Sequence, residues 1–536
     1  MFIDKLPEYL EDVTMLMKRR AKAKEKRDLW RSTYRDAFQY SMPSRETFSW
    51  HEEGQARNRI LFDSTLQEAC YTAANTLTAL LFPPWMRWAE LAPGASVPED
   101  QVSEDIKLGL QNATKTFFGF LNTSNFNTMI NECALDLQVG TAALVFDEGD
   151  QANPFVFHSE PLSALELEEG PNGTIETTWR HRHPLARNLL RIYDGMQEWD
   201  LSDATQKKIH ETPDDKISII QGEIYDPETK KYFGVAIDES AKQIIWRYDY
   251  GTSCPMIVGR ASKVAGETYG RGRVLLALSD ARTLDKMQEF VLTQAALQLA
   301  PPLTGVSDGI LNPYTANLTP NTIIPVASND SSNPSLKTIP LGGNFNISEQ
   351  MMKDLRERVR RTMLGPEPSE GPVKSATEIS VADRNRLWAM NGEYNRIQSE
   401  LIQKVVARGV FILQKKGLMP KFKVNGRDVA VKFTSPFAKT QNADDVMNLE
   451  RTIQILLPLG PQTIQMGLKM KDIPAYIARM QGIPESLIMT DADREELTKQ
   501  ATAAAQQMNQ AQIQSQQQMN APPPQQQSGP SPTPAQ

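Results

Sequence analysis

The longest amphipathic pattern in the chain follows a loop rich in proline and glycine at residues 365–372 and ends at Pro420. Apolar residues recur there at spacings of three, four and seven, which is the repeat of a helix with one buried face. Ser375 and Glu378 have the spacing of a capping box, and Gly417 can adopt the left-handed conformation that ends a helix. The pattern predicts a helix of about forty residues, on the order of 60 Å long. Its apolar stripe contains Leu387, Met390, Tyr394, Ile397, Leu401, Val405 and Ile412.

Shorter helices and two β-rich stretches are predicted before this helix. Helical spacing of apolar residues covers 7–40, 64–81, two segments of 101–138, 274–300 and 347–364. Branched and aromatic residues predict a β-rich stretch at 140–260, with strands at 174–179, 217–220 and 244–248. A smaller β-rich insertion is predicted at 301–345, with strands at 323–326 and 337–339.

After Pro420 the pattern changes again. A short β segment is predicted at 422–433, where an Asn-Gly pair indicates a hairpin turn, and helices follow at 442–457, 461–480 and from 491 onward. From Ala501 to Gln536 no charged residue occurs, and the bias toward glutamine and proline predicts a disordered tail. The fold class is therefore α+β and mostly helical.

Composition narrows the function classes. The 536 residues suffice for about three or four domain-sized units, and the formal net charge of −7 is not that of a basic nucleic-acid coat. DNA would meet such a protein at a local patch, or in a passage that does not grip it. Three widely spaced cysteines suit a reducing cytosol rather than a disulfide framework or a zinc cluster. No long apolar run or signal-peptide pattern occurs, so we expect no membrane contact.

Two clusters of basic residues stand out. The first lies in the helix predicted at 7–40, and we interpret it as a solvent-exposed helix face. The second lies in the helix predicted at 347–364, beside an apolar stripe of Met352, Leu355, Val359 and Met363. Neighbouring arginines have acids one turn before them, so three cations are expected to be unpaired on one face: Lys353, Arg356 and Arg360. The first cluster contains Arg19, Arg20, Lys22, Lys24, Lys26 and Arg27.

The motifs of common enzymes do not occur in the sequence. There is no phosphate-binding loop of the Gly-x-x-x-x-Gly-Lys type, no Gly-x-Ser-x-Gly elbow and no His-Glu-x-x-His pair. Gly270 and Gly272 precede a helix, but Leu275 occupies the third glycine position of a dinucleotide site, so we interpret the glycines as a flexible start to the helix. His181 and His183 have no third ligand at usable spacing. We therefore assign no catalytic residue, metal or cofactor; a nuclease assembled from distant acids stays open.

Several short motifs, in this order, resemble bacteriophage portal proteins, and most closely the head-to-tail connectors of short-tailed phages. The similarity covers most of residues 25–480. The motifs lie at Trp30-Arg31, Tyr40-Ser41-Met42-Pro43-Ser44-Arg45, Phe62-Asp63-Ser64-Thr65, Leu81-Phe82-Pro83-Pro84-Trp85, Tyr269-Gly270-Arg271-Gly272 and Ser375-Ala376-Thr377-Glu378-Ile379.

The resemblance implies a ring, usually of twelve subunits, at one vertex of the capsid, with double-stranded DNA passing through its axis. It implies a virion protein that is assembled in the host cytoplasm and has no catalytic site. The ranges that it implies are a wing at 1–265, stem helices at 266–300 and 346–364, a clip at 301–345, a channel loop at 365–376, the long wing helix and β return at 377–440, a crown at 441–500 and a tail at 501–536.

The resemblance also implies partners: the large subunit of the terminase, which docks on the clip, the major capsid and scaffolding proteins, and a tail adaptor. We expect the channel lining to contain Lys353, Arg356, Arg360, Glu367, Glu370 and Lys374. Lys353, Arg356 and Arg360 have an alternative role, which is pairing with acids of a neighbouring subunit. Two other functions stay open: a DNA-acting enzyme such as a nuclease subunit of a packaging machine, and a tail or adaptor ring.

Overall fold

The computed structural model describes most of the first 420 residues and short pieces beyond them. The chain divides into two compact units, Met1–Phe437 and Ala438–Gln536. The described residues are 3, 5–50, 54–55, 61–93, 104–193, 195–301, 303–305, 328, 330, 332, 336–338, 345–363, 391–420, 429–433, 449–456, 458, 473–480 and 489.

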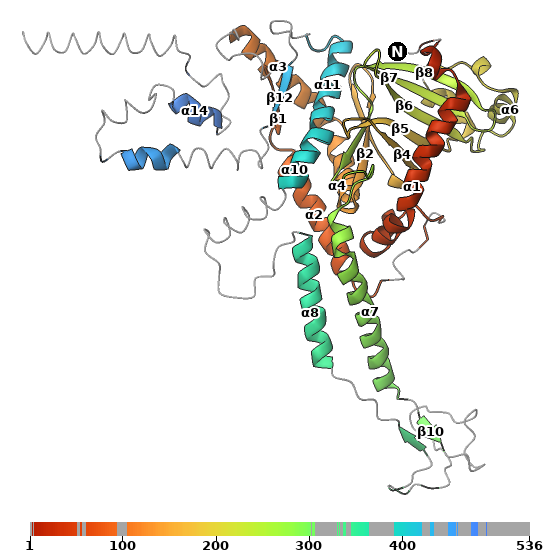
Figure 1. Ribbon diagram of the computed structural model, residues 1–536, viewed down its shortest axis with the longest axis vertical. Helices are drawn as coiled ribbons and strands as arrows, with labels where there is room; N and C mark the ends of the chain where they lie inside the picture. The colour runs from red at the N-terminus through yellow and green to blue at the C-terminus, as the bar shows by residue number, and fades with distance from the viewer. Residues whose placement is uncertain are drawn as a thin grey trace, which may run out of the picture. The chain divides into compact units, whose positions relative to one another are not determined.

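A five-stranded antiparallel sheet of order β4-β5-β6-β7-β8 forms the outer part of the first unit (Figure 1). Helix α1 (Val13–Ser41) lies on one face, where Leu16 and Ala23 pack against Trp179 and Val235. The excursion 184–216 covers the other face. The strands are β4 (Leu165–Glu169), β5 (Ile175–Arg182), β6 (Ile219–Asp226), β7 (Lys231–Asp238) and β8 (Gln243–Gly251), and the excursion holds η6 (Ala186–Asn188), α5 (Leu189–Ile192), η7 (Glu198–Asp200) and α6 (Asp203–Glu211).

A second antiparallel sheet has the order β3-β2-β9, with β2 (Thr141–Glu148) between β3 (Phe155–Glu160) and β9 (Met256–Arg260). The strand residues of β2 from Thr141 to Phe146 are all buried, so this strand is at the centre of the largest apolar cluster. Helices α2 (Thr65–Leu81), α3 (Glu104–Thr123) and α4 (Phe126–Val139) contribute to the same cluster. We call the two sheets and the helices packed on them the sheet body. Short 3-10 turns lie at η1 (Glu8–Leu10), η2 (Pro43–Arg45) and η5 (Leu162–Ala164).

The predicted helices and strands of this unit are largely confirmed. Helices near 7–40, 64–81 and 101–138, and strands near 174–179, 217–220 and 244–248, are all present. The β segment after Pro420 appears as β12 (Val429–Phe433), which pairs antiparallel with β1 (Ala89–Pro93), and the expected turn at 425–426 lies outside the described residues. The partner of β12 is therefore more than 300 residues away in sequence, which a local turn signal could not reveal.

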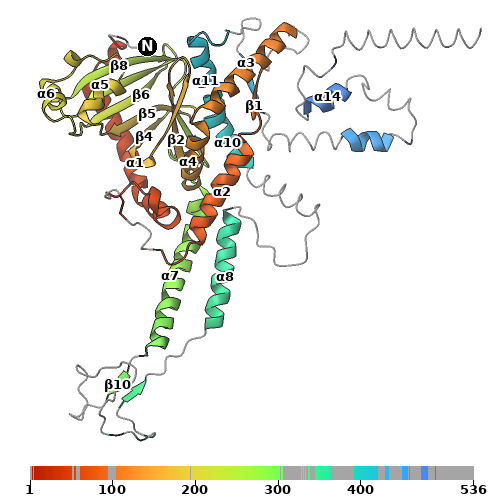
Figure 2. The same cartoon turned by 180° about the vertical axis from the view of Figure 1, so that it is seen from behind.

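Helices α7 (Arg273–Leu299) and α8 (Phe345–Thr362) lie side by side and antiparallel (Figures 1 and 2). Leu284 of α7 packs with Met352 and Leu355 of α8, which confirms the apolar stripe predicted for α8. At the far ends of the two helices, β10 (Leu303–Gly305) pairs with β11 (Leu336–Thr338). The strand predicted at 323–326 lies outside the described residues. We call α7 and α8 the helix pair.

The long amphipathic helix is present from Asn391 to Lys415, and its first part, 377–390, lies outside the described residues. The helical run consists of α10 (Asn391–Ile397), a π-helical turn (Gln398–Ile402) and α11 (Gln403–Lys415). Its predicted stripe is buried at all five described positions, and Gly417 has φ of +73°, the left-handed conformation predicted for the cap. The sequence did not predict the π-helical turn.

The second unit contributes two described helical segments, 449–456 and α14 (Ile473–Met480), within the helices predicted at 442–457 and 461–480. The predicted tail at 501–536 lies outside the described residues. Within the described part of the chain, no helix combines the length and the apolar character that a membrane span requires.

Candidate functional site where the helix pair joins the sheet body

A seam of close backbone contacts joins the start of α7 to the sheet body. A Cβ atom at Gly270 would lie 2.4 Å from the carbonyl oxygen of Gly140, and one at Gly272 would lie 2.1 Å from that of Gln138. The Gly272 N–H donates to the Val139 carbonyl at 2.9 Å. Our interpretation of these glycines as a flexible start to the helix is therefore wrong, because they permit a tight contact that a side chain would block.

Two tyrosines, Tyr34 of α1 and Tyr269 of the segment before α7, close the same seam. The Tyr34 hydroxyl donates to the Gly270 carbonyl at 2.6 Å, and the Tyr269 hydroxyl donates to the Leu165 carbonyl at 3.1 Å. Both rings are fully buried, and this burial raises the pKa of each phenol well above its ordinary value. Tyr34 of α1 and the motif Tyr269-Gly270-Arg271-Gly272 thus meet at the start of α7.

A second group of contacts holds the helix pair from the side of α2. The Asp285 carboxylate, on α7, accepts the backbone N–H groups of Phe62 and Asp63 at 2.6 and 3.1 Å. The Asp63 carboxylate accepts the Thr65 N–H at 2.9 Å and the Arg356 guanidinium of α8 at 2.8 and 3.0 Å. Burial opposes the charged form of Asp63, but these hydrogen bonds outweigh it and hold the pKa of Asp63 below its ordinary value.

These contacts test one of the channel-lining residues that the sequence predicts on α8. Arg356 is not unpaired, because it binds Asp63 of its own chain, so the expectation of three unpaired cations is wrong at this position. Lys353 is exposed and Arg360 half-buried on the same helix. The other three predicted residues, Glu367, Glu370 and Lys374, lie outside the described residues.

The helix pair also connects to the long helix. Arg273, the first residue of α7, donates to the Thr362 carbonyl at the end of α8 at 3.3 Å and to the Glu393 carboxylate of α10 at 3.0 Å. Further along, the Glu400 carboxylate of the π-helical turn accepts the backbone N–H and the guanidinium of Arg260, the latter at 2.6 Å. Arg260 is fully buried in β9, so the extra residue of the π turn lies where the helix is tied to the sheet.

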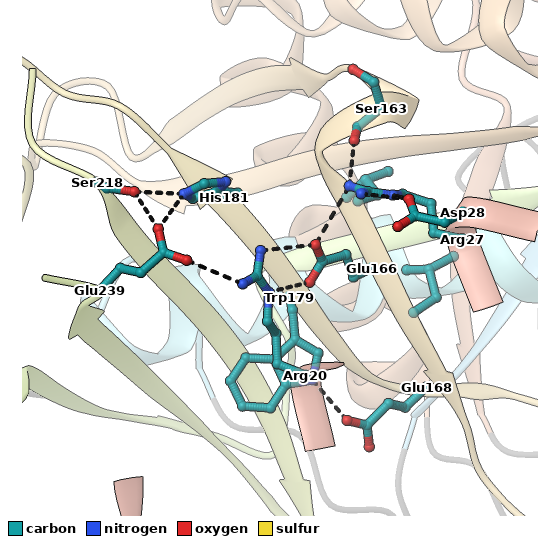
Figure 3. Close-up of polar contacts among 12 residues, drawn as sticks. Arg20, Arg27, Asp28, Ser163, Glu166, Glu168, Trp179, His181, Ser218 and Glu239 are labelled. Carbon is teal, nitrogen blue, oxygen red and sulfur yellow. Dashed lines mark hydrogen bonds and ion pairs between the residues drawn. The ribbon is translucent and has the colours of Figure 1, made fainter. Parts of the chain in front are cut away.

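Buried ion pairs tie α1 to the five-stranded sheet (Figure 3). The Arg20 guanidinium binds both carboxylate oxygens of Glu166, at 2.6 and 3.0 Å, and Glu166 has no exposed surface. Arg27 lies 3.4 Å from the same carboxylate, and Arg19 donates to Glu168 at 2.8 Å. The interpretation of the first basic cluster as a solvent-exposed face is therefore wrong for its three arginines.

His181, Ser218 and Glu239 lie beside this network, and their geometry is not that of a nucleophilic triad (Figure 3). The Nε2 atom of His181 contacts both the Ser218 hydroxyl at 2.6 Å and the Glu239 carboxylate at 3.0 Å. A catalytic triad uses the two ring nitrogens for the two partners, one for each. Burial lowers the pKa of His181 despite the nearby carboxylate.

The comparison with protein families decides the identity. A family described as the bacteriophage head to tail connecting proteins matches residues 13–489. The chain belongs to this family. It is a head-to-tail connector, or portal protein, of a bacteriophage virion, and the family is structural rather than enzymatic. A search among curated proteins gave no match.

The connector contacts that the sequence did not predict are those between distant segments. The charge pairing of α1 had a readable signal, because Leu165 and Leu167 alternate with Glu166 and Glu168. That alternation places two carboxylates on one face of a strand, which is unusual for a buried strand unless cations face it. Nothing near Asp63 in the sequence indicates Arg356, which lies 293 residues away.

Proposed function

We propose that the connector assembles into a closed ring, of twelve subunits as in its family, and that the helix pair forms the contacts around the axis. One observation carries this proposal. On α7, Leu276, Thr283, Phe290 and Leu297 recur every seven residues. The three apolar members are exposed by 73%, 61% and 39%, while the stripe one position later, with Leu284 and Val291, packs on α8.

A helix that is apolar on more than one side is normally covered on more than one side. A strict repeat of seven also favours left-handed packing against another helix. Ile347 and Met351 of α8 are exposed too, by 58% and 51%. A neighbouring copy that presents these residues to the exposed stripe would cover both sets. A contact between two different surfaces forms a ring when the rotation from copy to copy closes.

The proposed ring is the passage for double-stranded DNA at one vertex of the capsid. A polyanion must slide there, so a few cations that are partly offset by acids suit the wall better than a continuous basic lining. The pairing of Arg356 with Asp63 agrees with a wall that carries little net positive charge. Lys353, Arg360 and the loop residues Glu367, Glu370 and Lys374 remain our proposed lining, with the loop at the narrowest part.

The proposed partners follow from the same role. The insertion 301–345, which includes strands β10 and β11, follows α7 and precedes α8 in the sequence. It would dock the large terminase subunit. The major capsid and scaffolding proteins would contact the outside of the ring, and a tail adaptor would bind once packaging ends.

The native mass of the full chain without nucleotide tests the ring. We expect a closed oligomer that persists across ionic strengths. A Leu276→Ser/Phe290→Ser variant should shift the mass toward monomer while the subunit stays folded. The matched control, Leu190→Ser/Ile192→Ser, changes exposed apolar residues of the excursion and should keep the ring. A folded wild-type monomer at micromolar concentration would contradict the proposal.

DNA retention tests the loop. Rings that lack residues 367–373 should assemble and begin filling capsids, but the packaged genome should leak. Particles of this variant that hold full-length DNA as well as wild-type particles would exclude a retaining role for the loop.

A further inference from the structure

The basic residues at the start of α1 divide by residue type. The three arginines, Arg19, Arg20 and Arg27, reach acids or carbonyl groups of the sheet. The lysines in the same segment are exposed, and within the described part of the chain none of them forms an ion pair with a carboxylate. They are Lys18, Lys22, Lys24 and Lys26, which we call the lysine ridge.

Contacts with the sheet explain why the arginines of this segment are arginines, but they do not explain the lysines. A planar guanidinium binds a buried carboxylate through two parallel hydrogen bonds, which an ammonium group cannot do. The arginines therefore hold α1 on the sheet. The lysine ridge contributes nothing to that contact, and across residues 18–27 the only acid is Glu25. A solvent-exposed helix face usually carries both positive and negative side chains. The predominance of positive charge on the lysine ridge therefore indicates an anionic partner.

The spacing of the ridge fits a regular row of charges. Lys18, Lys22 and Lys26 follow one another every four residues, so they lie on successive turns of one side of α1. They span on the order of 12 Å along the helix axis. Phosphates of one DNA strand follow one another about every 3.4 Å along the duplex axis, so the ridge spans roughly three to four phosphates.

The side chains that line a groove at the end of the ridge fit duplex DNA better than single-stranded DNA. Lys26, Leu29 and Trp30 line a cavity of about 380 Å³ together with Glu267 and Arg271. Proteins that bind single strands stack bases on open aromatic rings. The Trp30 ring is already engaged, because Tyr34 stacks on it at 5.2 Å and the Arg271 guanidinium lies 4.7 Å from its centroid.

Arg271 is itself neutralised by Glu267, with hydrogen bonds at 2.6 and 2.9 Å. The groove therefore offers neither a free ring nor a free guanidinium for reading a base. Lysines that act as point charges position a phosphate backbone without reading its sequence.

We propose that the lysine ridge binds the backbone of double-stranded DNA, without sequence preference, at a surface separate from the passage of the ring. The proposal rests on the proposed function in one respect, which is that DNA is the polyanion this protein handles. A surface that grips phosphates would oppose sliding, so the DNA bound here is not the DNA that moves through the axis.

The test uses preformed rings and a covalently closed circular plasmid. A closed circle has no end and cannot thread a closed ring, so its binding reports on surfaces outside the passage. Native mass measurement of each variant first establishes that the ring is intact, which separates a failure of this proposal from a failure of ring assembly.

Two variants with the same change of charge are compared by gel mobility. One replaces the ridge by K18Q/K22Q/K24Q/K26Q. The control replaces four exposed lysines of α3, α6 and the segment that follows α6, as K115Q/K207Q/K208Q/K216Q. A third variant, K18R/K22R/K24R/K26R, keeps the charge.

We expect wild-type rings to bind the circle and to lose affinity as salt rises. The ridge variant should bind at least about tenfold more weakly at low salt, and the slope of log affinity against log salt should fall by about 0.9 for each lysine in contact. The control and the arginine variant should bind as the wild type does.

Three results would overturn the proposal. Wild-type rings could fail to bind the circle at low salt, or the ridge and control variants could lose affinity equally, which would show an effect of net charge alone. In the third case ridge-variant rings bind the circle normally but no longer join capsid shells, and the partner is then an acidic protein surface.

Discussion

The sheet body and the helix pair differ in how far contacts within one subunit pair their buried charges and cover their apolar side chains. In the sheet body, buried charges find partners within the same chain, as in the pairs Arg20–Glu166, Arg180–Glu223 and Arg260–Glu400. In the helix pair, exposed apolar residues remain on α7 after α8 has covered one side. The buried charges of the sheet body are therefore paired within a single subunit, whereas the exposed stripe of α7 is covered only in the ring that we propose.

The variant with the largest expected effect on stability removes a buried charge from the sheet body. Arg20→Ala leaves the Glu166 carboxylate buried without its main partner, so we expect the free energy of unfolding to fall by about 3–5 kcal/mol. Urea denaturation of the full chain measures the loss. The exposed neighbour gives the control, since Lys22→Ala should change the same quantity by less than about 0.5 kcal/mol.

A companion variant sharpens the interpretation. Replacing both partners, as in Arg20→Met with Glu166→Leu, should recover most of the loss, because an apolar pair needs no charge partner. If Arg20→Ala were as stable as the wild type, the pair would have no role in holding α1.

The second prediction concerns the seam between the two regions. Gly272→Ala places a methyl group against backbone of α4 that cannot move aside, and we expect a loss of about 1–3 kcal/mol in the free energy of unfolding. Gly392→Ala in α10 meets open space, so it should stabilise the subunit by up to about 1 kcal/mol. Thermal unfolding of both variants shows whether the signs are opposite; equal effects would mean that the seam is not tight.

The third prediction concerns the contact that holds the helix pair at its base. Asp63→Asn should cost about 1 kcal/mol at neutral pH, through weaker bonds to Thr65 and Arg356. Because the pKa of Asp63 is lowered in the folded chain, its contribution is present above 3.8, the ordinary value, and is lost as pH falls through the folded pKa.

The difference between wild type and Asp63→Asn should therefore be constant near neutral pH and shrink in acid. Urea denaturation at a series of pH values measures it. A difference that grows in acid would mean that the carboxylate is not stabilised by these contacts.

The smallest effect on the subunit itself is expected from the exposed stripe of α7. Thr283→Ser or Phe290→Ser should change the free energy of unfolding of dissociated subunits by less than about 0.5 kcal/mol, since the side chains are already exposed there. Phe290→Ser should nevertheless weaken the ring, and Thr283→Ser should not. Dilution of each ring followed by sedimentation measures the two effects; equal dissociation would remove Phe290 from the interface.

The sequence predicted the elements better than the contacts between them. Helical and strand periodicity is a local property, and it located α2, α7, α8 and most of the five-stranded sheet. The described part of the long helix, Asn391 to Lys415, was also located, together with its cap at Gly417, because the stripe and the cap are read from neighbouring residues.

What sequence reasoning missed depends on segments that are far apart in the chain. The partner of β12 is β1, the partner of Arg356 is Asp63, and the acceptor of Arg20 is Glu166. A basic residue has the same appearance in the sequence whether a carboxylate or water faces it, so the division between arginines and lysines in α1 required the fold. The π-helical turn at Glu400 was hidden for the same reason, since the residue that Glu400 binds there is Arg260 on a distant strand.

The central claim is that the exposed stripe of α7 is covered by another copy of the chain, while the core of the sheet body is buried without one. Hydroxyl-radical footprinting of assembled rings and of dissociated subunits tests it most directly. The account predicts that Leu276, Phe290 and Leu297 become protected in the ring, while buried residues of the sheet body such as Trp179 react equally little in both states. Equal reactivity of the α7 stripe in rings and in subunits would contradict it.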